Sequence, residues 1–71
     1  MNLTEVPEGS TVRIARVVSG RGLLLRLREL GIFEGASLTV VRNSRGPVIL
    51  RVFGSTLAIG RMQAARIEVE K

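Results

Sequence analysis

The sequence predicts a mainly β fold, a small barrel of about five strands with one short α-helix between strands 1 and 2. Short runs in which apolar and polar residues alternate are separated by turns rich in Gly, Pro, Asn and Ser, the pattern of a compact barrel. Only one stretch has helical spacing instead. The chain has 71 residues, which suits a single domain over residues 1–71 with a small core.

The helical stretch lies within residues 20–35. Leu23, Leu27 and Leu30 follow the i, i+4, i+7 spacing that places side chains on one face, so we expect all three to face the core. Gly31 comes next, where glycine commonly ends a helix in a left-handed conformation. A helix between Gly22 and Gly31 is too short to be stable alone, so packing on the sheet must hold it.

Two further leucines do not fit this stripe. Leu24 sits at its flank, and Leu25 falls on the opposite face, beside Arg28 and Glu29. Single exposed leucines are ordinary on protein surfaces. The alternative is that Leu24, Leu25 and Arg28 form a contact patch for another protein.

The five runs with strand character cover residues 11–18, 37–43, 48–53, 56–59 and 67–70. In the first run the alternation slips at Arg16, and a β-bulge near Ala15 and Arg16 would turn Arg13 and Arg16 outward. Leu38 and Val40 are the expected inward residues of the second run.

The third run divides cleanly into two faces, with Val48, Leu50 and Val52 on one and Ile49, Arg51 and Phe53 on the other. A tight turn at Gly54 and Ser55 follows, with Gly54 at positive φ. Leu57, Ile59, Ile67 and Val69 are expected to point inward from the last two strands.

The remaining segments are connections. Residues 2–8 form a lead-in from which Leu3 and Val6 pack loosely against the barrel. Residues 43–47 form a hairpin loop dense in turn-forming residues, and residues 61–65 can make one helical turn.

Composition excludes several kinds of site. The chain contains no Cys, His or Asp, so we expect no disulfide, no cofactor, no zinc or haem ligation and no enzyme activity. Glu68 and Glu70 lie on one face of a predicted strand and could hold a divalent cation only weakly, so we also expect no metal site.

The net charge of +5 permits contact with nucleic acid, an anionic membrane or an acidic protein face. The arginines are spread along the chain, and no Tyr or Trp is present to stack on bases. A nucleic-acid-binding barrel therefore ranks as the alternative, and we expect no nucleic acid partner. Gly20 and Gly22 match no phosphate-loop fingerprint.

Residues 1–7 contain neither a basic region nor an apolar run of the kind found in signal peptides, so we expect no signal peptide. No apolar run approaches the roughly 20 residues needed to cross a bilayer. We expect a cytoplasmic protein that meets a membrane only through a partner.

One ordered set of motifs spans nearly the whole chain. Arg26-Leu27-x-x-Leu30-Gly31-Ile32, with Gly35 three residues on, is followed by Leu57-Ala58-Ile59 and by Ala64-x-x-Ile67-x-Val69. In this order the motifs resemble the FeoA family of bacterial ferrous iron transport. Glu34 stands where the family often has proline, and Gly60 where a basic residue is common.

The resemblance implies an SH3-like barrel and a role beside a large ferrous iron permease that carries a cytoplasmic GTP-binding domain. It supplies no catalytic residue. The surface residues expected to bind such a partner are Leu24, Leu25, Arg28, Ile49 and Phe53. A variant of this hypothesis is a GTPase activator that inserts a loop arginine, Arg21 or Arg45, into the partner's active site.

Overall fold

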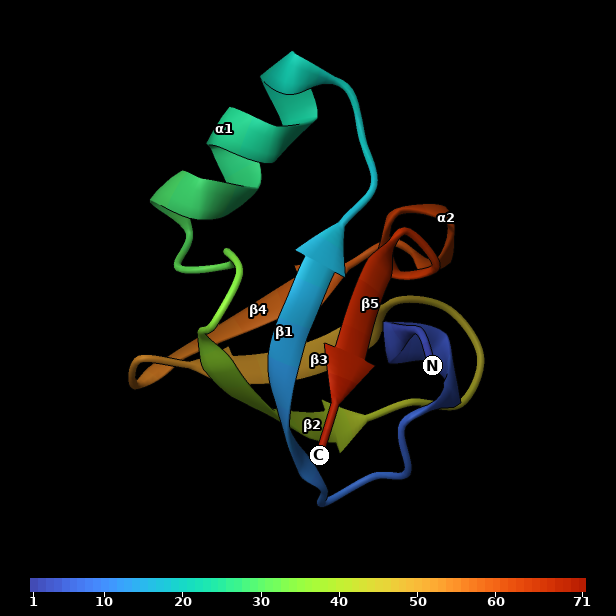
Figure 1. Ribbon diagram of the computed structural model, residues 1–71. Helices are drawn as coiled ribbons and strands as arrows, with labels where there is room; N and C mark the ends of the chain where they lie inside the picture. Colours follow the sequence, from blue (N-terminus) through green and yellow to red (C-terminus); the bar gives the residue numbers. More distant parts are fainter.

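The computed structural model describes residues 1–71. In chain order its elements are η1 (Leu3–Glu5), β1 (Thr11–Val17), α1 (Arg21–Glu29), β2 (Ser37–Arg42), β3 (Val48–Val52), β4 (Ser55–Ile59), α2 (Arg61–Ala64) and β5 (Ile67–Glu70). The strands form one antiparallel sheet in the order β4-β3-β2-β1-β5, which curls around the core while α1 stands beyond one end of it (Figure 1). The predicted fold class, mainly β with one helix between strands 1 and 2, is confirmed.

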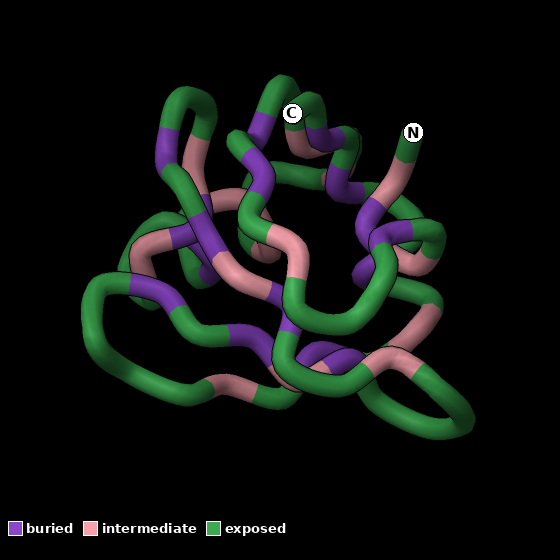
Figure 2. The backbone as a smooth tube through the Cα atoms, turned by 90° about the horizontal axis from the view of Figure 1, so that it is seen from below, coloured by how far each residue is buried: buried purple, intermediate pink, exposed green.

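The core is entirely apolar, with 16 buried residues and no buried polar or charged side chain. Buried and exposed stretches alternate along the strands (Figure 2), as expected when one face of a sheet meets the core. The core residues are Leu3, Val6, Val12, Ile14, Leu27, Ile32, Ala36, Leu38, Val40, Val48, Leu50, Val52, Ile59, Ala64, Ile67 and Val69.

The bulge predicted in the first strand is present. The pairing of β1 with β5 shifts register between Ile14 and Arg16, so Ala15 is the extra residue. Arg13 and Arg16 are both exposed as a result. The bulge bends β1 enough for it to pair with β2 through its first residues and with β5 through the rest.

The tight turn between β3 and β4 lies one residue earlier than predicted. Val52 pairs with Ser55, so the two turn residues are Phe53 and Gly54. Their φ angles of 48° and 79° are both positive, the signature of a type I′ turn. Gly54 has the predicted positive φ. Phe53 was wrongly assigned to the strand because a bulky aromatic residue rarely adopts that conformation.

The N-terminal segment is more tightly packed than predicted, since Leu3 and Val6 are fully buried. Asn2 caps η1 through a capping box with Glu5. From the β2–β3 loop, the Asn43 amide nitrogen donates hydrogen bonds to the backbone carbonyls of residues 4 and 6, at 2.9 and 2.8 Å. These long-range bonds hold the lead-in against the sheet.

Helix α1 buries only Leu27, while Leu23 is half-buried. The expectation that Leu30 faces the core is wrong, because its side chain is 42% exposed. The helix ends at Glu29 in a Schellman motif: the Ile32 N–H donates to the Leu27 carbonyl, and the residue between the cap and Ile32, Gly31, has φ 93°. Ile32 thereby takes the core position beside Leu27 that was expected for Leu30.

Candidate functional site

Seven large apolar side chains are exposed, and they are candidates for contact with a partner. They are Met1, Val18, Leu25, Leu30, Val41, Phe53 and Met62. Leu25 and Leu30 belong to α1 and its C-terminal cap, and Phe53 lies at the tip of the β3–β4 hairpin. We call Leu25, Arg28, Phe33 and Phe53 the helix–hairpin surface, because Arg28 shares one recess with Leu25 and another with Phe33, and Phe33 stacks on Phe53.

Phe53 joins the hairpin tip to the end of α1. Its ring stacks on that of Phe33, with centroids 6.0 Å apart and planes 21° apart. It also lies over Gly31, where an added Cβ would come within 2.8 Å of the Phe53 Cδ2 atom. Despite these contacts Phe53 is 72% exposed, so its ring presents one face to solvent. A bulky residue held at positive φ and left exposed is the kind of strained position often found at functional sites.

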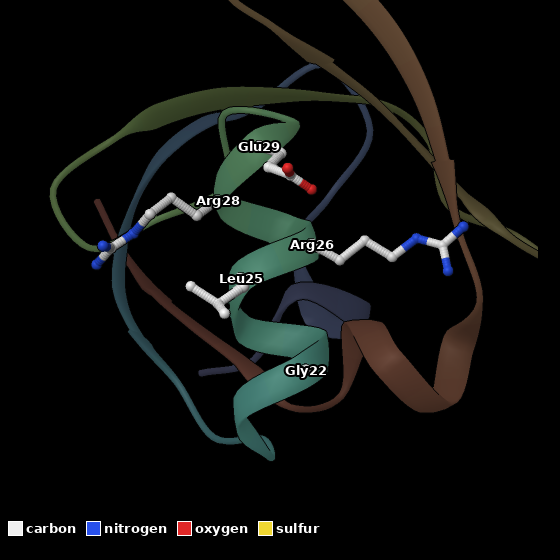
Figure 3. Close-up of a pocket in the computed structure, with 5 residues that line it drawn as sticks. All are labelled: Gly22, Leu25, Arg26, Arg28 and Glu29. Atoms are coloured by element: carbon white, nitrogen blue, oxygen red, sulfur yellow. The ribbon is translucent and has the colours of Figure 1, made fainter.

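Leu25 and Arg28 lie on the outer face of α1, as expected from the helical spacing (Figure 3). Gly22 leaves a shallow open depression beside Leu25, which is 52% exposed. In Figure 3 Leu25 and Arg28 point to the same side of the helix, whereas Arg26 points to the opposite side. The α1 part of the helix–hairpin surface is therefore an apolar side chain flanked by a guanidinium group.

Leu24 lies between this face and the core. It is half-buried and lines a small cavity of about 90 Å³ with Val17, Ile32 and Phe33, and Arg28 lies at the same cavity. Leu24 thus supports the helix–hairpin surface from behind and offers less area for contact than Leu25.

The other residues selected from the sequence lie elsewhere. Ile49 is half-buried on the outer face of β3, opposite Ala58. Arg21 is the first residue of α1 and Arg45 is in the β2–β3 loop. These two exposed arginines are at separate parts of the molecule (Figure 1), so they do not form one site.

Phe33 is a member of the helix–hairpin surface that sequence reasoning did not select, and Leu30 is an exposed residue that sequence reasoning placed in the core. Leu30 appeared to be a core residue because it continues the helical stripe. Gly31 is the signal that could have revealed the exposure of Leu30, because a helix that ends at a glycine need not direct the residue before that glycine toward the core.

A second recess separates α1 from β4 and α2. This groove has a volume of about 280 Å³. It is lined by Leu23, Arg26, Leu27, Leu30, Ala58, Ile59 and Gln63.

Few charges are paired. The single ion pair joins the Arg16 guanidinium to the Glu68 carboxylate at 3.9 Å, and both side chains are largely exposed. Arg61 donates a 3.2 Å hydrogen bond to the Gly46 carbonyl. No cluster of three or more acidic side chains is present, and no helix is long and apolar enough to span a membrane.

The family model described as "FeoA domain" matches residues 1–71. The chain belongs to the FeoA domain family. The resemblance read from the motifs is therefore confirmed.

Two curated relatives of this FeoA-domain chain carry descriptive names. A Methanocaldococcus jannaschii protein, named as a candidate Fe(2+) transport protein A, is 44% identical over 63 residues, which are 89% of this chain and 77% of the relative. A Porphyromonas gingivalis protein, named as a fusion of Fe(2+) transport protein A with the Fe(2+) transporter FeoB, is 38% identical over 73 residues. That match covers 99% of this chain and 8% of the fusion protein.

Solved FeoA structures share the fold. A crystal structure described as the iron uptake regulatory protein FeoA superposes with a TM-score of 0.92 at 28% identity, covering 99% of this chain and 95% of that one. The Stenotrophomonas maltophilia FeoA, described as a prokaryotic SH3 domain protein, superposes with a TM-score of 0.82, covering 99% of this chain and 89% of that one. At 24% identity the latter bears on the fold alone, and it confirms the expected SH3-like architecture.

Proposed function

We propose that this FeoA-domain chain is a small cytoplasmic accessory protein of ferrous iron transport that binds the cytoplasmic GTP-binding region of the membrane permease. The observation that carries the proposal is the Porphyromonas gingivalis fusion, in which a segment matching 99% of this chain shares one polypeptide with the transporter FeoB. A covalent link raises the effective concentration of two domains that associate weakly. A separate chain with the same fold is expected to meet the same partner without the link.

We propose that the chain acts by contact and is not itself an enzyme. The sequence offers no His, Cys or Asp, the residues that most often supply a base or a nucleophile. What the molecule presents instead is exposed apolar area with arginine at its border. That combination is typical of protein interfaces, which favour aromatic residues and Arg and exclude Lys and Glu from their centre.

The helix–hairpin surface is the proposed docking site. Leu25 and Phe53 supply apolar area, and Arg28 supplies a charge that can pair with an acidic group of the partner. Exposed residues that become desolvated at an interface centre carry most of the binding energy. Leu25 is expected to be such a residue because it is the most exposed leucine of the chain.

The test is a binding titration against the isolated GTP-binding domain of a ferrous iron permease from the same cell, with and without nucleotide and at two salt concentrations. Leu25→Glu should weaken binding by about tenfold or more, the effect of losing a central contact and burying a charge. Val41→Glu is the matched control, because Val41 is 47% exposed against 52% for Leu25 and lies on β2 rather than α1. If both variants bind like the wild type, the helix–hairpin surface is not the docking site.

Two other readings have separate tests. Salt-sensitive binding to mixed RNA, with no binding to the GTP-binding domain, would favour the nucleic-acid alternative suggested by the charge of +5. Acceleration of GTP hydrolysis by this chain, lost in Arg21→Ala or Arg45→Ala, would favour the arginine-finger variant.

A further inference from the structure

The strand β4 has one edge without a partner. It pairs only with β3 and stands at the end of the strand order. In a two-residue hairpin the residues flanking the turn, Val52 and Ser55, exchange hydrogen bonds, and the pairs then alternate. The N–H and C=O groups of Thr56 and Ala58 therefore point away from β3. No turn, loop or cap hydrogen bond from the rest of the chain reaches either residue.

The opposite edge of the sheet is protected. The N–H of Val69 in β5 donates to the Met1 carbonyl at 2.8 Å, and Asn2 forms a bridge with Glu68. Two glutamates of β5 add charge to that edge. By contrast, Ser55–Ile59 contains neither a charged residue nor a proline, the usual devices that prevent strand addition. Of the two end strands of the sheet, β4 is therefore the one left open to a further strand.

The groove between α1 and β4 lies beside this free edge. Ala58 lines this recess of about 280 Å³ together with Leu23, Leu27 and Leu30 of the helix side, so the free edge of β4 borders the recess at Ala58. In strand addition the backbone supplies hydrogen bonds and recesses for alternate side chains supply selectivity. Here every second side chain of an added strand would meet apolar groups.

The charges near this edge determine which residues an added strand would favour at the positions that do not face the groove. Arg26 is at the rim of the groove, and Arg51 pairs with Thr56 on the outer face of the hairpin. No acidic residue lines the groove, and the chain carries a net charge of +5. A second copy of the chain would bring like charge, whereas an acidic segment would bring the opposite charge.

We propose that the free edge of β4 binds an extended segment of a partner protein, in which apolar side chains alternate with acidic ones, by adding it as a further strand. This binding mode is distinct from docking on the helix–hairpin surface and holds whichever protein supplies the segment.

The first test is residue-resolved amide hydrogen exchange of the free protein. Thr56 and Ala58 should exchange much faster than Leu57, whose N–H points toward β3. Addition of a short peptide of alternating glutamate and valine should slow the exchange of Thr56 and Ala58 by about tenfold or more, because these two amides then donate to the added strand. Leu25 and Arg28 amides should be unaffected, which distinguishes this site from the helix–hairpin surface.

Altered peptides and variants of Ala58 test whether binding needs the acidic side chains and the backbone N–H groups. A peptide with lysine in place of glutamate, and one with a central proline, should each bind at least about tenfold more weakly, through lost charge complementarity and a lost backbone donor. Ala58→Pro should abolish binding of the glutamate–valine peptide, while Ala58→Ser, which keeps the N–H, should preserve it.

Three results would overturn the proposal. The first is unchanged exchange of Thr56 and Ala58 at saturating peptide. The second is equal binding of the glutamate and lysine peptides. The third is protection of the same amides that rises with protein concentration in the absence of peptide, since the occupant of the edge would then be a second copy of the chain.

Discussion

Gly31 is the position where one added methyl group should be most costly. Its φ of 93° is strained for any residue with a Cβ. An added Cβ would also lie 2.8 Å from Phe53 Cδ2 and 3.0 Å from Val52 Cγ1. The Phe53 ring can swing into solvent because it is mostly exposed, but Val52 is only 1% exposed and has no free space. Gly31→Ala therefore combines backbone strain with overpacking.

The two contributions can be separated in magnitude. A left-handed conformation costs an L-residue about 1–2 kcal/mol. Overpacking of a filled site costs about 1–3 kcal/mol more, and we expect the lower part of that range since one of the two neighbours can move. The free energy of unfolding should fall by about 2–4 kcal/mol in total, a shift in Tm of about 4–8 °C for each kcal/mol in a domain of this size.

Gly35 provides the matched control. Its φ of 90° is nearly that of Gly31, yet nothing lies within 4 Å of the position where its Cβ would be. Gly35→Ala should therefore show only the conformational cost, about 1–2 kcal/mol. The difference between the two variants measures the close approach of the β3–β4 hairpin to the end of α1.

Urea unfolding followed by circular dichroism gives both free energies from the midpoint and slope. Adding Phe53→Ala to Gly31→Ala should recover part of the loss by removing the nearest clashing atoms. Equal losses in Gly31→Ala and Gly35→Ala, with no recovery in the double variant, would show that the hairpin does not press on Gly31.

Three further predictions concern other parts of the molecule. Asn43→Asp should lower the free energy of unfolding by about 2–4 kcal/mol, because two backbone carbonyls of the lead-in lose their donor and face a carboxylate. Thermal unfolding measures this loss, and an unchanged Tm would mean that the two hydrogen bonds of Asn43 are dispensable. Phe53→Asn should change the free energy of unfolding by less than about 1 kcal/mol, because the gain from Asn in the type I′ turn offsets the lost stacking on Phe33. The same variant should weaken partner binding. Strong destabilisation would contradict this balance. Glu68→Gln should alter stability by less than about 0.5 kcal/mol because its ion pair with Arg16 is exposed, and a larger change in urea unfolding would argue against this assignment.

Local patterns in the sequence were sufficient to locate all five strands, with errors only at their ends. The slip at Arg16 predicted the bulge in β1, because a period-two pattern leaves only one way to keep both arginines outward. Alternation likewise predicted the inward faces of β3 and β5, Val48, Leu50 and Val52 in the first case. These features depend on neighbours in the chain and so appear in the sequence.

Features that depend on distant contacts were not visible. Leu3 and Val6 are buried in a segment that Asn43, nearly forty residues away, holds through the carbonyls of Thr4 and Val6. Leu30 continues the helical stripe in sequence, but the Schellman motif replaces it with Ile32 in the core. Phe53 has no propensity for a left-handed turn, and its conformation follows from the pairing of the two strands it joins.

In the candidate site, too, local features were predictable from the sequence and contacts between distant elements were not. Helical spacing was enough to place Leu25 and Arg28 together on the outer face of α1. It could not show that Phe53, more than twenty residues later, meets the end of the same helix through Phe33. The contacts between elements define the surface, and single-sequence periodicity describes only the elements.

The pairing of β5 has a consequence for synthesis of the chain on the ribosome. Residues 67–70 emerge after every segment they contact, including β1 and the first two residues. Until then β1 has only its pairing with β2, and Leu3 and Ile14 lack the two apolar residues of β5 as core neighbours. Because these pairings need residues 67–70, folding is expected to be completed only after that strand has left the ribosome. The large sequence separation of β1 and β5 places folding on the slower time scale of β-rich topologies.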